Sequence, residues 1–351
     1  MNKLNVCVLF GGVSTEHSVS EISASAVLDN IDRERYNVFP VGITMEGKWL
    51  FYDGEIQKIR SHEWEKGSVC PAVISPDSSD RALLVFRESG VEKVGLDVVY
   101  PVLHGKNGED GTVQGLCRLA GIPCVGSGVI GSAICMDKCV AKIMFEKAGI
   151  PQARWVEVRK GIEPDFEMIE EKLGYPCFIK PSSAGSSFGV TKAHNRGELE
   201  EGIVLAFMHD YKVLVEEAID AREVECGVMG NFGPKTANVL GEIKPAKDFY
   251  DFKSKYEDDS SELILPANVD KETEEKIKEY ACRAYKICEC RGYARVDFFV
   301  ERNKGNIILN EINTIPGFTP ISMYPKVWEK SGVAMKELIN MHIDFALGCE
   351  D

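Results

Sequence analysis

Residues 292–318 decide the fold of this chain: they read GYARVDFFV, then ERNKG, then NIILNEINTIPGF. Two apolar runs that alternate with period two flank a polar turn containing Gly305, and this pattern predicts an antiparallel hairpin. In the first strand, alternation places Arg295 and Asp297 on one face and the apolar residues between them on the other. The first strand therefore has a polar face and a core-facing one.

The second strand of the hairpin adds further polar groups. Period-two alternation predicts that Glu311 and Asn313 share a face with Ile307 and Leu309. Carboxylate and amide oxygens are hard donors of the kind that magnesium accepts. This strand thus offers two candidate metal ligands.

The register of the hairpin would bring the polar groups together. With Val300 opposite Asn306, Arg295 lies opposite Glu311, and Asp297 is a diagonal step of about 7–8 Å away. Such a cluster would cost several kcal/mol of desolvation if it were merely buried. A magnesium ion that carries phosphate fits these donors. A surface ladder of charged pairs is the alternative interpretation.

The composition is that of an ordinary globular chain. Its 351 residues are 44% hydrophobic and 27% charged, and this length favours two or three domains. The net charge of −14 and the absence of a basic block argue against a nucleic-acid partner, so an anionic ligand would need a local group of cations. No apolar run approaches the ~20 residues that span a bilayer, and the apolar run near the start is too short for a secretory signal. We therefore expect a cytoplasmic protein with no membrane partner.

Cysteine and histidine, the metal-binding residue types other than the acids, form no recognisable metal centre in the sequence. The 12 cysteines are scattered without a C-x-x-C pair, and we interpret most of them as reduced core residues. The six histidines are dispersed as well. A disulfide framework or a zinc site is not predicted.

The first unit begins with a buried strand at residues 5–10, a turn GGVSTEHSVS and a helix over about 19–30. A dinucleotide fingerprint is absent, but Glu16 lies at a helix entry at the carboxyl edge of a sheet, where open α/β sheets bind ligands. The alternative is that Glu16 only complements the helix dipole. Further strand and helix signals follow, and the polar loop 104–111 has three glycines that permit close backbone approach to a small ligand.

A second unit extends from Met136 to about Ala218. Lys138 opens a helix, and a strand places Lys180 just before the loop SSAGSSFG at 182–189. The loop lacks the ending of a Walker P-loop but has the small residues, hydroxyls and adjoining lysine of an anion cradle. A mobile linker is the alternative.

The third unit begins with a strand at about 222–230 that carries Glu223. Residues 244–266 then form a polar segment with three aromatic residues and no periodicity. A loop of this length inside a domain is usually an active-site lid, although disorder caused by its high charge is the alternative. An amphipathic helix follows from Asp270 to about Cys290.

Together these lysines, acids and the small-residue loop predict a nucleoside triphosphate site, and their order resembles that of the ATP-grasp enzymes. The closer resemblance is to the D-alanine:D-alanine ligases. It rests on seven segments that follow the order of that family between about residues 6 and 325, namely FGGVSTEHSVS, PVLHGKNGEDGT, MDK, IKPSSAGSSFGV, YDFKSKY, ARVD and NEINTIPGFTPISMYP.

The resemblance implies an α/β fold with α+β elements, arranged as a three-domain ATP-grasp enzyme. It implies a Rossmann-like N-terminal substrate domain on an open parallel sheet at 1–126, a small central domain at 127–217 and a C-terminal domain at 218–351 with the lid loop 244–266. The nucleotide would lie between the central and C-terminal domains. A homodimer is also implied, because family members are commonly dimers.

The resemblance also implies a nucleotide site. Lys138 and Lys180 would hold the α- and β-phosphates of ATP, with Ser186 and Ser187 closing over the β- and γ-phosphates. Two magnesium or manganese ions would be bound by Asp297, Glu311 and Asn313, with Glu311 bridging them. Adenine and ribose would contact Glu216, Glu217, Ile219 and Glu223.

The implied amino-acid sites lie beside the phosphates. Glu16 would take the ammonium of the first D-amino acid and would be linked through Ser186 to Tyr256 on the lid, and His104 would line this site. Lys255 would reach the γ-phosphate and, with Ser322, the carboxylate of the second substrate. Arg295 and the amide of Gly317 would form the oxyanion hole.

The implied reaction is the ligation of two D-alanines through an acyl phosphate, with release of ADP and phosphate, for peptidoglycan precursors. Relatives that accept D-serine or D-lactate often have arginine where Met323 stands, so Met323 and the retained Tyr256 favour D-alanine as the second substrate. A D-alanine:D-serine or D-lactate ligase is the alternative. A nucleotide-binding sensor with an idle site is a second, different alternative, which the complete set of metal ligands disfavours.

Overall fold

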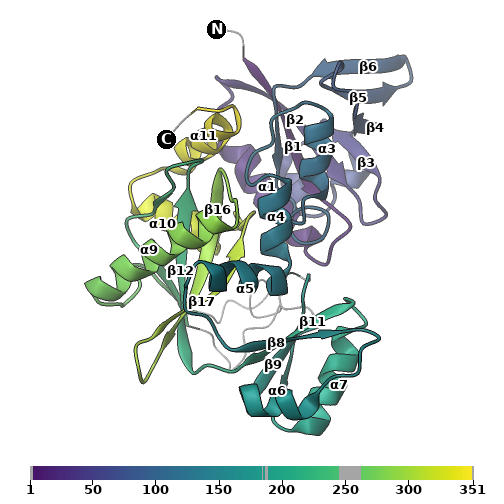
Figure 1. Ribbon diagram of the computed structural model, residues 1–351. Coiled ribbons are helices and arrows are strands. Elements are labelled where there is room, and N and C mark those ends of the chain that lie inside the picture. The colour runs from purple at the N-terminus through teal and green to yellow at the C-terminus, as the bar shows by residue number, and fades with distance from the viewer. Residues whose placement is uncertain (1–2, 184, 186–188, 245–261, 350–351) are drawn as a thin grey trace.

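The computed structural model describes residues 3–183, 185, 189–244 and 262–349 of the chain. Its strands form three sheets, each covered by helices (Figure 1). None of the helices in these ranges is both long and apolar enough to cross a membrane. All 12 cysteines lie in these ranges as free thiols, and eight of them are buried, as predicted for core residues.

The N-terminal sheet has seven strands in the order β6-β5-β4-β3-β2-β1-β7. Only β1 with its neighbours β2 and β7 is parallel, as predicted; β3 to β6 extend the sheet as an antiparallel meander that the sequence patterns did not reveal. Strand β1 is buried from Val6 onward, which explains its continuous apolar run. The bounds are β1 Leu4–Gly11, β2 Tyr36–Ile43, β3 Trp49–Tyr52, β4 Val69–Ile74, β5 Ala82–Arg87, β6 Gly90–Gly95 and β7 Val98–Pro101.

The helices of this part connect it to the rest of the molecule. Helix α1 packs on β1, and the C-terminal helix α11 contacts both α1 and β7 (Figure 1). One core cluster therefore contains residues from both ends of the chain, such as Val6 and Ile343. The bounds are α1 His17–Asn30, α2 Ile56–Arg60, the 3-10 helix η1 Trp64–Lys66, α3 Thr112–Leu119, α4 Val129–Met136, α5 Lys138–Lys147 and α11 Met335–Ala346.

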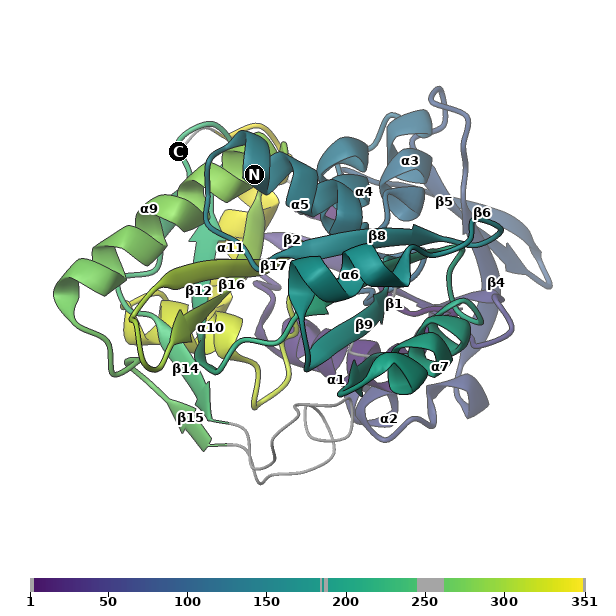
Figure 2. The ribbon, with the colours of Figure 1, turned by 60° about the horizontal axis from the view of Figure 1, so that its bottom comes forward.

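The central sheet is antiparallel, with the order β10-β9-β11-β8. Helices α6 and α7 lie across one face of it (Figure 2), and the side chains between them and the sheet form a separate core cluster. The bounds are β8 Trp155–Arg159, α6 Phe166–Leu173, β9 Cys177–Pro181, β10 Thr191–Ala193, α7 Arg196–Ala206 and β11 Lys212–Glu217. Strand β9 thus delivers Lys180 to the edge where the predicted anion cradle begins.

The third sheet has the order β15-β14-β12-β16-β17, and β13 pairs with β12. The predicted amphipathic helix is α9, which begins after the N-cap Asp270 and buries Ile277, Ala281 and Ala284 against this sheet. The bounds are β12 Ala221–Met229, β13 Lys235–Thr236, β14 Gly241–Lys244, β15 Glu262–Ile264, α9 Lys271–Ile287, β16 Tyr293–Glu301, β17 Ile307–Asn313 and α10 Met323–Lys330.

The hairpin β16–β17 forms as predicted, but its register differs from the expected one. Val300 pairs with Ile307 instead of Asn306, and a bulge at Asn310 shifts the register again between Asp297 and Phe298. As a result, Asp297 lies directly opposite Glu311. The predicted pairing of Arg295 with Glu311 is therefore wrong, because Arg295 pairs with Asn313.

The bulge also changes which face the second strand presents. Ile307, Leu309 and Ile312 are buried in the cluster under α9, whereas Glu311 and Asn313 are only partly buried. The expectation that these two polar residues share a face with Ile307 and Leu309 is wrong, since one extra residue in a strand reverses the alternation beyond it. The bulge thus turns Glu311 and Asn313 toward the polar face of β16.

The segment predicted as a lid loop, 244–266, includes residues that belong to strands. Lys244 ends β14, and residues 262–264 form β15, which pairs with β14 in antiparallel fashion. Lys244 Nζ also lies 3.2 Å from Glu262 Oε2. The ends of the segment are therefore held together on the edge of the third sheet, and residues 245–261 lie outside the described ranges.

Candidate active site

Three loops predicted to carry ligand groups meet at Glu16. Its side chain is buried, with 5% exposed, at the N-terminus of α1. A Cβ atom on Gly105 would lie 2.5 Å from Glu16 Oε2, and one on Gly185 would also collide with this oxygen. Only glycine allows both backbones to approach so closely. The structure thus brings the turn after β1, the loop 104–111 and the Ser/Gly loop to one carboxylate.

His104 lies in the second of these loops and is buried between two elements. Its Nδ1 lies 3.0 Å from the carbonyl oxygen of Ile315, and its Nε2 lies 3.1 Å from Ser23 Oγ. Burial lowers the pKa of His104 to about 4, against a raising effect of the Ile315 carbonyl, and the charge of Arg295 lowers it further. The ring is therefore neutral near pH 7, with the proton on Nδ1 donated to Ile315 and Nε2 accepting from the Ser23 hydroxyl.

Ser23 extends this link to the loop after β17. The amide N–H of Phe318 donates to Ser23 Oγ at 3.1 Å. One hydroxyl of α1 thus joins His104 to the residue that follows Gly317. Ser23 was not predicted from the sequence, because a serine inside a helix carries no local sign of its distant partners.

Glu109 is a second residue that sequence reasoning missed. Its carboxylate accepts from the backbone N–H of Gly105 at 2.8 Å and from that of Ile315 at 3.0 Å. Burial raises the pKa of Glu109 to about 8, and the charge of Glu16 contributes. Glu109 therefore fixes the His104 loop against the segment after β17. The sequence signal that could have identified Glu109 is the presence of an acid inside a glycine-rich loop.

A buried group of charges supports Lys180. Lys180 Nζ lies 2.7 Å from Glu216 Oε2, and Lys142 forms an ion pair with the other oxygen of Glu216. Burial alone would raise the pKa of Glu216, but the charges of Lys142 and Lys180 outweigh it and lower the pKa to about 2. Lys142 was not predicted, although it follows Lys138 by four residues and so lies on the same face of α5.

Lys180 also connects the central sheet to the third sheet. Burial opposes the charge of Lys180, yet its pKa is raised, first by Glu216 and then by Glu311 and Glu223. Lys180 and Glu216 lie on β9 and β11, whereas Glu223 and Glu311 lie on β12 and β17. Predicted nucleotide residues of the two sheets therefore lie close enough to interact: Glu223 and Glu311 of the third sheet stabilise the charge of Lys180 on the central sheet.

The N-terminus of α5 lies beside the end of β9. The amide N–H of Lys138 donates to the carbonyl of Ser182 at 2.9 Å. Asp137, the N-cap of α5, accepts from the amide of Val140 at 3.1 Å and from Ser182 Oγ at 2.7 Å, and it pairs with Lys212. The positive end of a helix dipole thus lies next to the Ser/Gly loop, which favours an anion there.

The predicted adenine residues lie at the end of β11. The carboxylate of Glu217 pairs with Arg154, with Oε2 2.7 Å from Nε, so this side chain is engaged within the central sheet. Its backbone N–H donates to the carbonyl of Arg154 at 3.0 Å. Ile219 follows in the partly buried connection to β12. Glu216, Glu217 and Ile219 thus lie where β11 of the central sheet leads into β12 of the third sheet.

The polar face of the hairpin forms a compact network. Arg295 Nε and Nη2 donate to the two oxygens of Asp297 at 2.8 and 2.7 Å, and Arg295 Nε also lies 3.2 Å from Glu225 Oε2. The side-chain amide of Asn313 donates to Asp297 Oδ2 at 2.8 Å. The predicted convergence of arginine, acids and amide is therefore present, with Glu225 as an additional member.

The donor set of this network fits magnesium. Asp297, Glu311 and Asn313 offer two carboxylates and one amide oxygen. The described residues contain no cluster of three or more His, Cys, Asp and Glu side chains able to hold a metal by themselves. Magnesium usually binds through one or two carboxylates and completes its shell with water and substrate phosphates. The residues present thus suit ions that arrive with a nucleotide.

The segment after β17 carries the predicted second-substrate residues. A Cβ atom on Gly317 would lie 2.7 Å from Ser322 Oγ, and Ser322 Oγ accepts from the amide of Thr319 at 3.0 Å. Met323 is buried in the core, where its thioether packs so closely on Gly241 that no Cβ fits there. Met323 thus belongs to the packing at the start of β14, and its selective role remains a prediction.

Four predicted site residues lie outside the described ranges: Ser186, Ser187, Lys255 and Tyr256. Their roles remain predictions, and so does the link from Glu16 through Ser186 to Tyr256. Their flanking residues are placed, since Gly185 touches Glu16 and Lys244 ends β14.

Comparisons with known proteins cover nearly the whole chain. A family model described as D-ala D-ala ligase N-terminus matches residues 5–127, and one described as D-ala D-ala ligase C-terminus matches residues 144–344. The chain is 50% identical to a D-alanine–D-alanine ligase of Acetivibrio thermocellus, covering 99% of this chain and 96% of that one. It is 51% identical to one of Clostridium novyi, covering 98% of each.

A solved structure agrees with these sequence matches. The VanG D-Ala:D-Ser ligase from Enterococcus faecalis superposes with a TM-score of 0.90 at 42% identity, covering 98% of this chain and 100% of that one. The predicted α/β ATP-grasp fold is thereby confirmed.

Proposed function

The chain belongs to the D-alanine–D-alanine ligase family, and on that premise we propose that it joins two D-alanine molecules with conversion of ATP to ADP and phosphate. The observation that carries the proposal is the position of Lys180. This lysine of the central sheet pairs with Glu216, and the charges of Glu223 and Glu311 from the third sheet raise its pKa. A cation between two sheets, beside hard oxygen donors, suits a nucleoside triphosphate.

The nucleotide would be bound by residues from both sheets. Lys138 and Lys180 would hold the α- and β-phosphates, and the N-terminus of α5 adds a favourable dipole beside them. Ser186 and Ser187 would close over the β- and γ-phosphates. The base and ribose would be contacted by Glu216, Glu217, Ile219 and Glu223.

Two magnesium or manganese ions would be held by Asp297, Glu311 and Asn313. Bound there, they would neutralise charge on the transferring phosphoryl group. Lys255 would reach the γ-phosphate from the lid. The protein itself contributes Arg295, whose guanidinium is oriented by both oxygens of Asp297.

The first D-alanine would bind with its ammonium at Glu16. Burial raises the pKa of Glu109 to about 8 and the charge of Glu16 adds to this shift, so a cation such as the substrate ammonium would be favoured beside these two acids. The neutral ring of His104 would line the same site without repelling the ammonium. The substrate carboxylate would then attack the γ-phosphorus, and ADP would leave as the acyl phosphate forms.

The second D-alanine would complete the reaction. Its amine would attack the carbonyl carbon of the acyl phosphate, and phosphate would leave as the peptide bond forms. Arg295 and the backbone N–H of Gly317 would stabilise the oxyanion. Ser322 and Lys255 would bind the second carboxylate. Tyr256 on the lid would help to exclude water, which would otherwise hydrolyse the acyl phosphate.

D-Alanine is favoured over D-serine as the second substrate. The relatives at 50 and 51% identity are D-alanine–D-alanine ligases, whereas the D-Ala:D-Ser ligase structure is 42% identical. A pocket that selects a hydroxyl normally offers it a hydrogen-bond partner, and the thioether of Met323 is a weak one. The structural likeness to the D-Ala:D-Ser ligase keeps D-serine as the second candidate.

Further features of the proposal concern the organisation of the chain. We place domain boundaries after residues 126 and 217, so that each domain contains one sheet. We also propose a homodimer that acts in the cytoplasm, where ATP is available, and that supplies peptidoglycan precursors. Light scattering of the purified protein tests the oligomeric state.

A substrate-competition assay tests the proposed function. The protein is incubated with ATP, magnesium, D-alanine, D-serine and D-lactate together, and the products are identified by mass spectrometry. D-Alanyl-D-alanine is expected as the main product, with one phosphate released per dipeptide. Phosphate release at background level would refute the ligase function. If D-alanyl-D-serine were the main product, the protein would be a D-alanine:D-serine ligase, the second candidate.

A further inference from the structure

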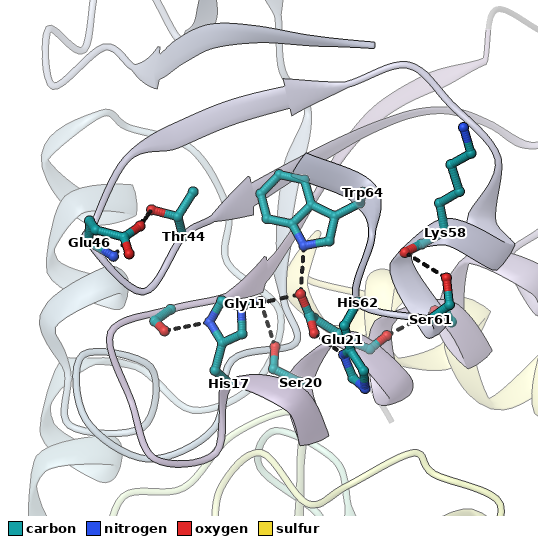
Figure 3. Close-up of polar contacts among 12 residues, drawn as sticks. Gly11, His17, Ser20, Glu21, Thr44, Glu46, Lys58, Ser61, His62 and Trp64 are labelled. Carbon is teal, nitrogen blue, oxygen red and sulfur yellow. Dashed lines mark hydrogen bonds and ion pairs between the residues drawn. The ribbon is translucent and has the colours of Figure 1, made fainter. Parts of the chain in front are cut away.

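The buried carboxylate of Glu21 in α1 is contacted by three hydrogen-bonding groups that the proposed mechanism does not use (Figure 3). Glu21 has 2% of its surface exposed. Trp64 Nε1 donates to Glu21 Oε1 at 2.5 Å, His17 Nε2 lies 3.2 Å from the same oxygen, and His62 Nδ1 contacts Oε2. Burial would raise the pKa of Glu21, but hydrogen bonds from His17, His62 and Trp64 lower it. Glu21 is therefore an anion in the folded protein.

His17 is held between two acceptor oxygens. Its Nδ1 lies 2.8 Å from the carbonyl oxygen of Gly12. Its Nε2 faces the Glu21 carboxylate (Figure 3). A neutral imidazole has only one N–H, so it would leave one of these contacts without a proton, whereas an imidazolium satisfies both. Burial lowers the pKa of His17, but the Glu21 hydrogen bond and the Gly12 carbonyl outweigh it, and the pKa is raised.

The other carboxylates around His17 act in the same direction. Glu65 of η1 raises the pKa of His17, in addition to Glu21. Glu46, in the turn between β2 and β3, has a pKa that is lowered mainly by the Thr44 hydroxyl and in small part by His17. These carboxylates, from three different elements, favour the imidazolium.

The carbonyl that His17 holds belongs to the turn that presents Glu16. The Gly12 carbonyl also accepts from the amide of Ser14 at 3.0 Å, and the Gly12 amide donates to the carbonyl of Ile43 at 2.7 Å. Ser14 Oγ accepts from the amide of Glu16 at 3.2 Å. The turn is thus fixed to β2 on one side and to the His17 ring on the other.

The ring also occupies space that only a glycine leaves open. A Cβ atom on Gly11 would lie 2.9 Å from Cε1 of His17, and Gly11 has a φ of +82°. The Gly11 amide donates to Ser20 Oγ at 2.8 Å, one turn further along α1. The turn and the first turns of α1 therefore form one hydrogen-bonded unit around the ring.

We propose that His17, as an imidazolium, is a positioning residue that clamps the Gly12 carbonyl against Glu21 and thereby fixes Glu16 for the ammonium of the first amino acid. The proposal rests on the proposed function in assigning that ammonium to Glu16. When the imidazolium loses a proton, the neutral ring keeps its Nε2–H on the Glu21 carboxylate and leaves the Gly12 carbonyl without a donor. The turn is then looser, so the apparent affinity for D-alanine falls as the pH rises through the pKa of His17. The chemical step is unaffected once substrate is bound.

Two substitutions separate the two contacts of the ring. The side-chain amide nitrogen of asparagine takes the place of Nδ1, so His17→Asn keeps a donor for the Gly12 carbonyl. The side-chain amide nitrogen of glutamine takes the place of Nε2, so His17→Gln loses the donor to the Gly12 carbonyl. We expect His17→Gln to raise the KM for D-alanine at the first site roughly tenfold, the effect of losing one charge-assisted hydrogen bond, with kcat within about twofold. His17→Asn should stay within about threefold of the wild type in KM and lose the rise of KM with pH that His17 causes.

The exposed His194, paired with Glu198 on α7, is the matched control: His194→Asn should leave KM and its pH profile unchanged. Equal KM values for the His17→Gln and His17→Asn variants would overturn the clamp. A wild-type pH profile in His17→Asn would overturn the role of the proton. Circular dichroism checks that each variant is folded.

A measurement without turnover keeps this proposal apart from the proposed function. The C2–H resonance of His17 is assigned by its absence from the spectrum of His17→Asn and is titrated by NMR in the wild-type protein without substrates. A pKa above the ordinary value of 6.5 is expected, and a value at or below 6.5 would refute the imidazolium. If the wild type releases no phosphate with D-alanine, the proposed function fails, while this titration still decides the state of His17.

Discussion

Asp297 lies directly opposite Glu311 across the hairpin β16–β17. Like charges in directly opposed positions of an antiparallel pair are destabilising, and a cation relieves them. The repulsion between the two carboxylates is partly offset within β16, where Arg295 donates to both oxygens of Asp297. The direct opposition of two carboxylates therefore argues against a stabilising ladder of charged pairs at this position.

The first prediction concerns this pair. Glu311→Gln should reduce phosphate release by about a thousandfold, because one ligand of the phosphate-bound ions is lost. The midpoint of urea unfolding should change little, since the substitution removes the repulsion from Asp297 together with the attraction to Lys180. Glu301→Gln, at the far end of β16, is the control and should retain activity. Substantial activity in Glu311→Gln would contradict the metal role.

The second prediction concerns the buried charges of Lys142, Glu216 and Lys180. Glu216→Gln leaves the buried Lys142 and the partly buried Lys180 without their shared anion and should lower the free energy of unfolding by about 3 kcal/mol or more. Lys142→Met leaves one lysine and one carboxylate, so its loss should be smaller, about 1–2 kcal/mol. Urea unfolding measures both, and the exposed Lys147→Met is the control in the same helix. The reverse order of the two losses would be inconsistent with a shared anion.

The third prediction concerns the hydroxyl that joins His104 to Phe318. Ser23→Ala removes the donor to His104 Nε2 and the acceptor for the Phe318 amide, so the backbone at Gly317 should be less well positioned. We expect kcat to fall about tenfold or more, with the KM for ATP unchanged. Ser25 is equally buried in α1, but among the residues that the structure describes its hydroxyl has one partner, within the helix, the carbonyl of Glu21 at 2.9 Å. Ser25→Ala should therefore retain kcat, and equal losses in both variants would argue against the link.

The fourth prediction concerns acid stability. Burial lowers the pKa of His342 to about 3 and that of His104 to about 4, both from an ordinary value of 6.5. The unfolded chain binds a proton at these sites below pH 6.5 while the folded chain does not, so their contribution to stability is complete above pH 6.5 and declines toward pH 4. Each group should contribute a slope of about 1.4 kcal/mol per pH unit.

His342→Phe tests this slope, because it removes one of the two groups. The variant loses hydrogen bonds to the hydroxyls of Tyr100 at 2.8 Å and Tyr324 at 3.0 Å and should be less stable at pH 7. Its unfolding free energy, measured in urea between pH 6.5 and 4, should nevertheless fall less steeply than that of the wild type. The exposed His194→Asn should keep the wild-type slope. An unchanged slope in His342→Phe would show that His342 is not a buried neutral group.

The features that the sequence by itself determined are those that depend on near neighbours. The strand, turn and helix around Glu16, the N-cap Asp270 with its helix, and the alternation of β16 all follow from local patterns, and all are present. The residue types that we propose for phosphate and metal binding were also recognisable in the sequence, because their chemistry does not depend on the fold. Seven short segments in a family's order identified the enzyme class.

The tertiary structure alone decided how these groups meet. A single extra residue at Asn310 set the pairing of Asp297 with Glu311, and alternation predicts a face only within an unbroken strand. Ser23 reaches Phe318 across 295 positions, and Glu109 reaches Ile315 across 206. Contacts of this separation leave no periodic trace in a single sequence, since each partner is an ordinary residue until the fold brings the two together.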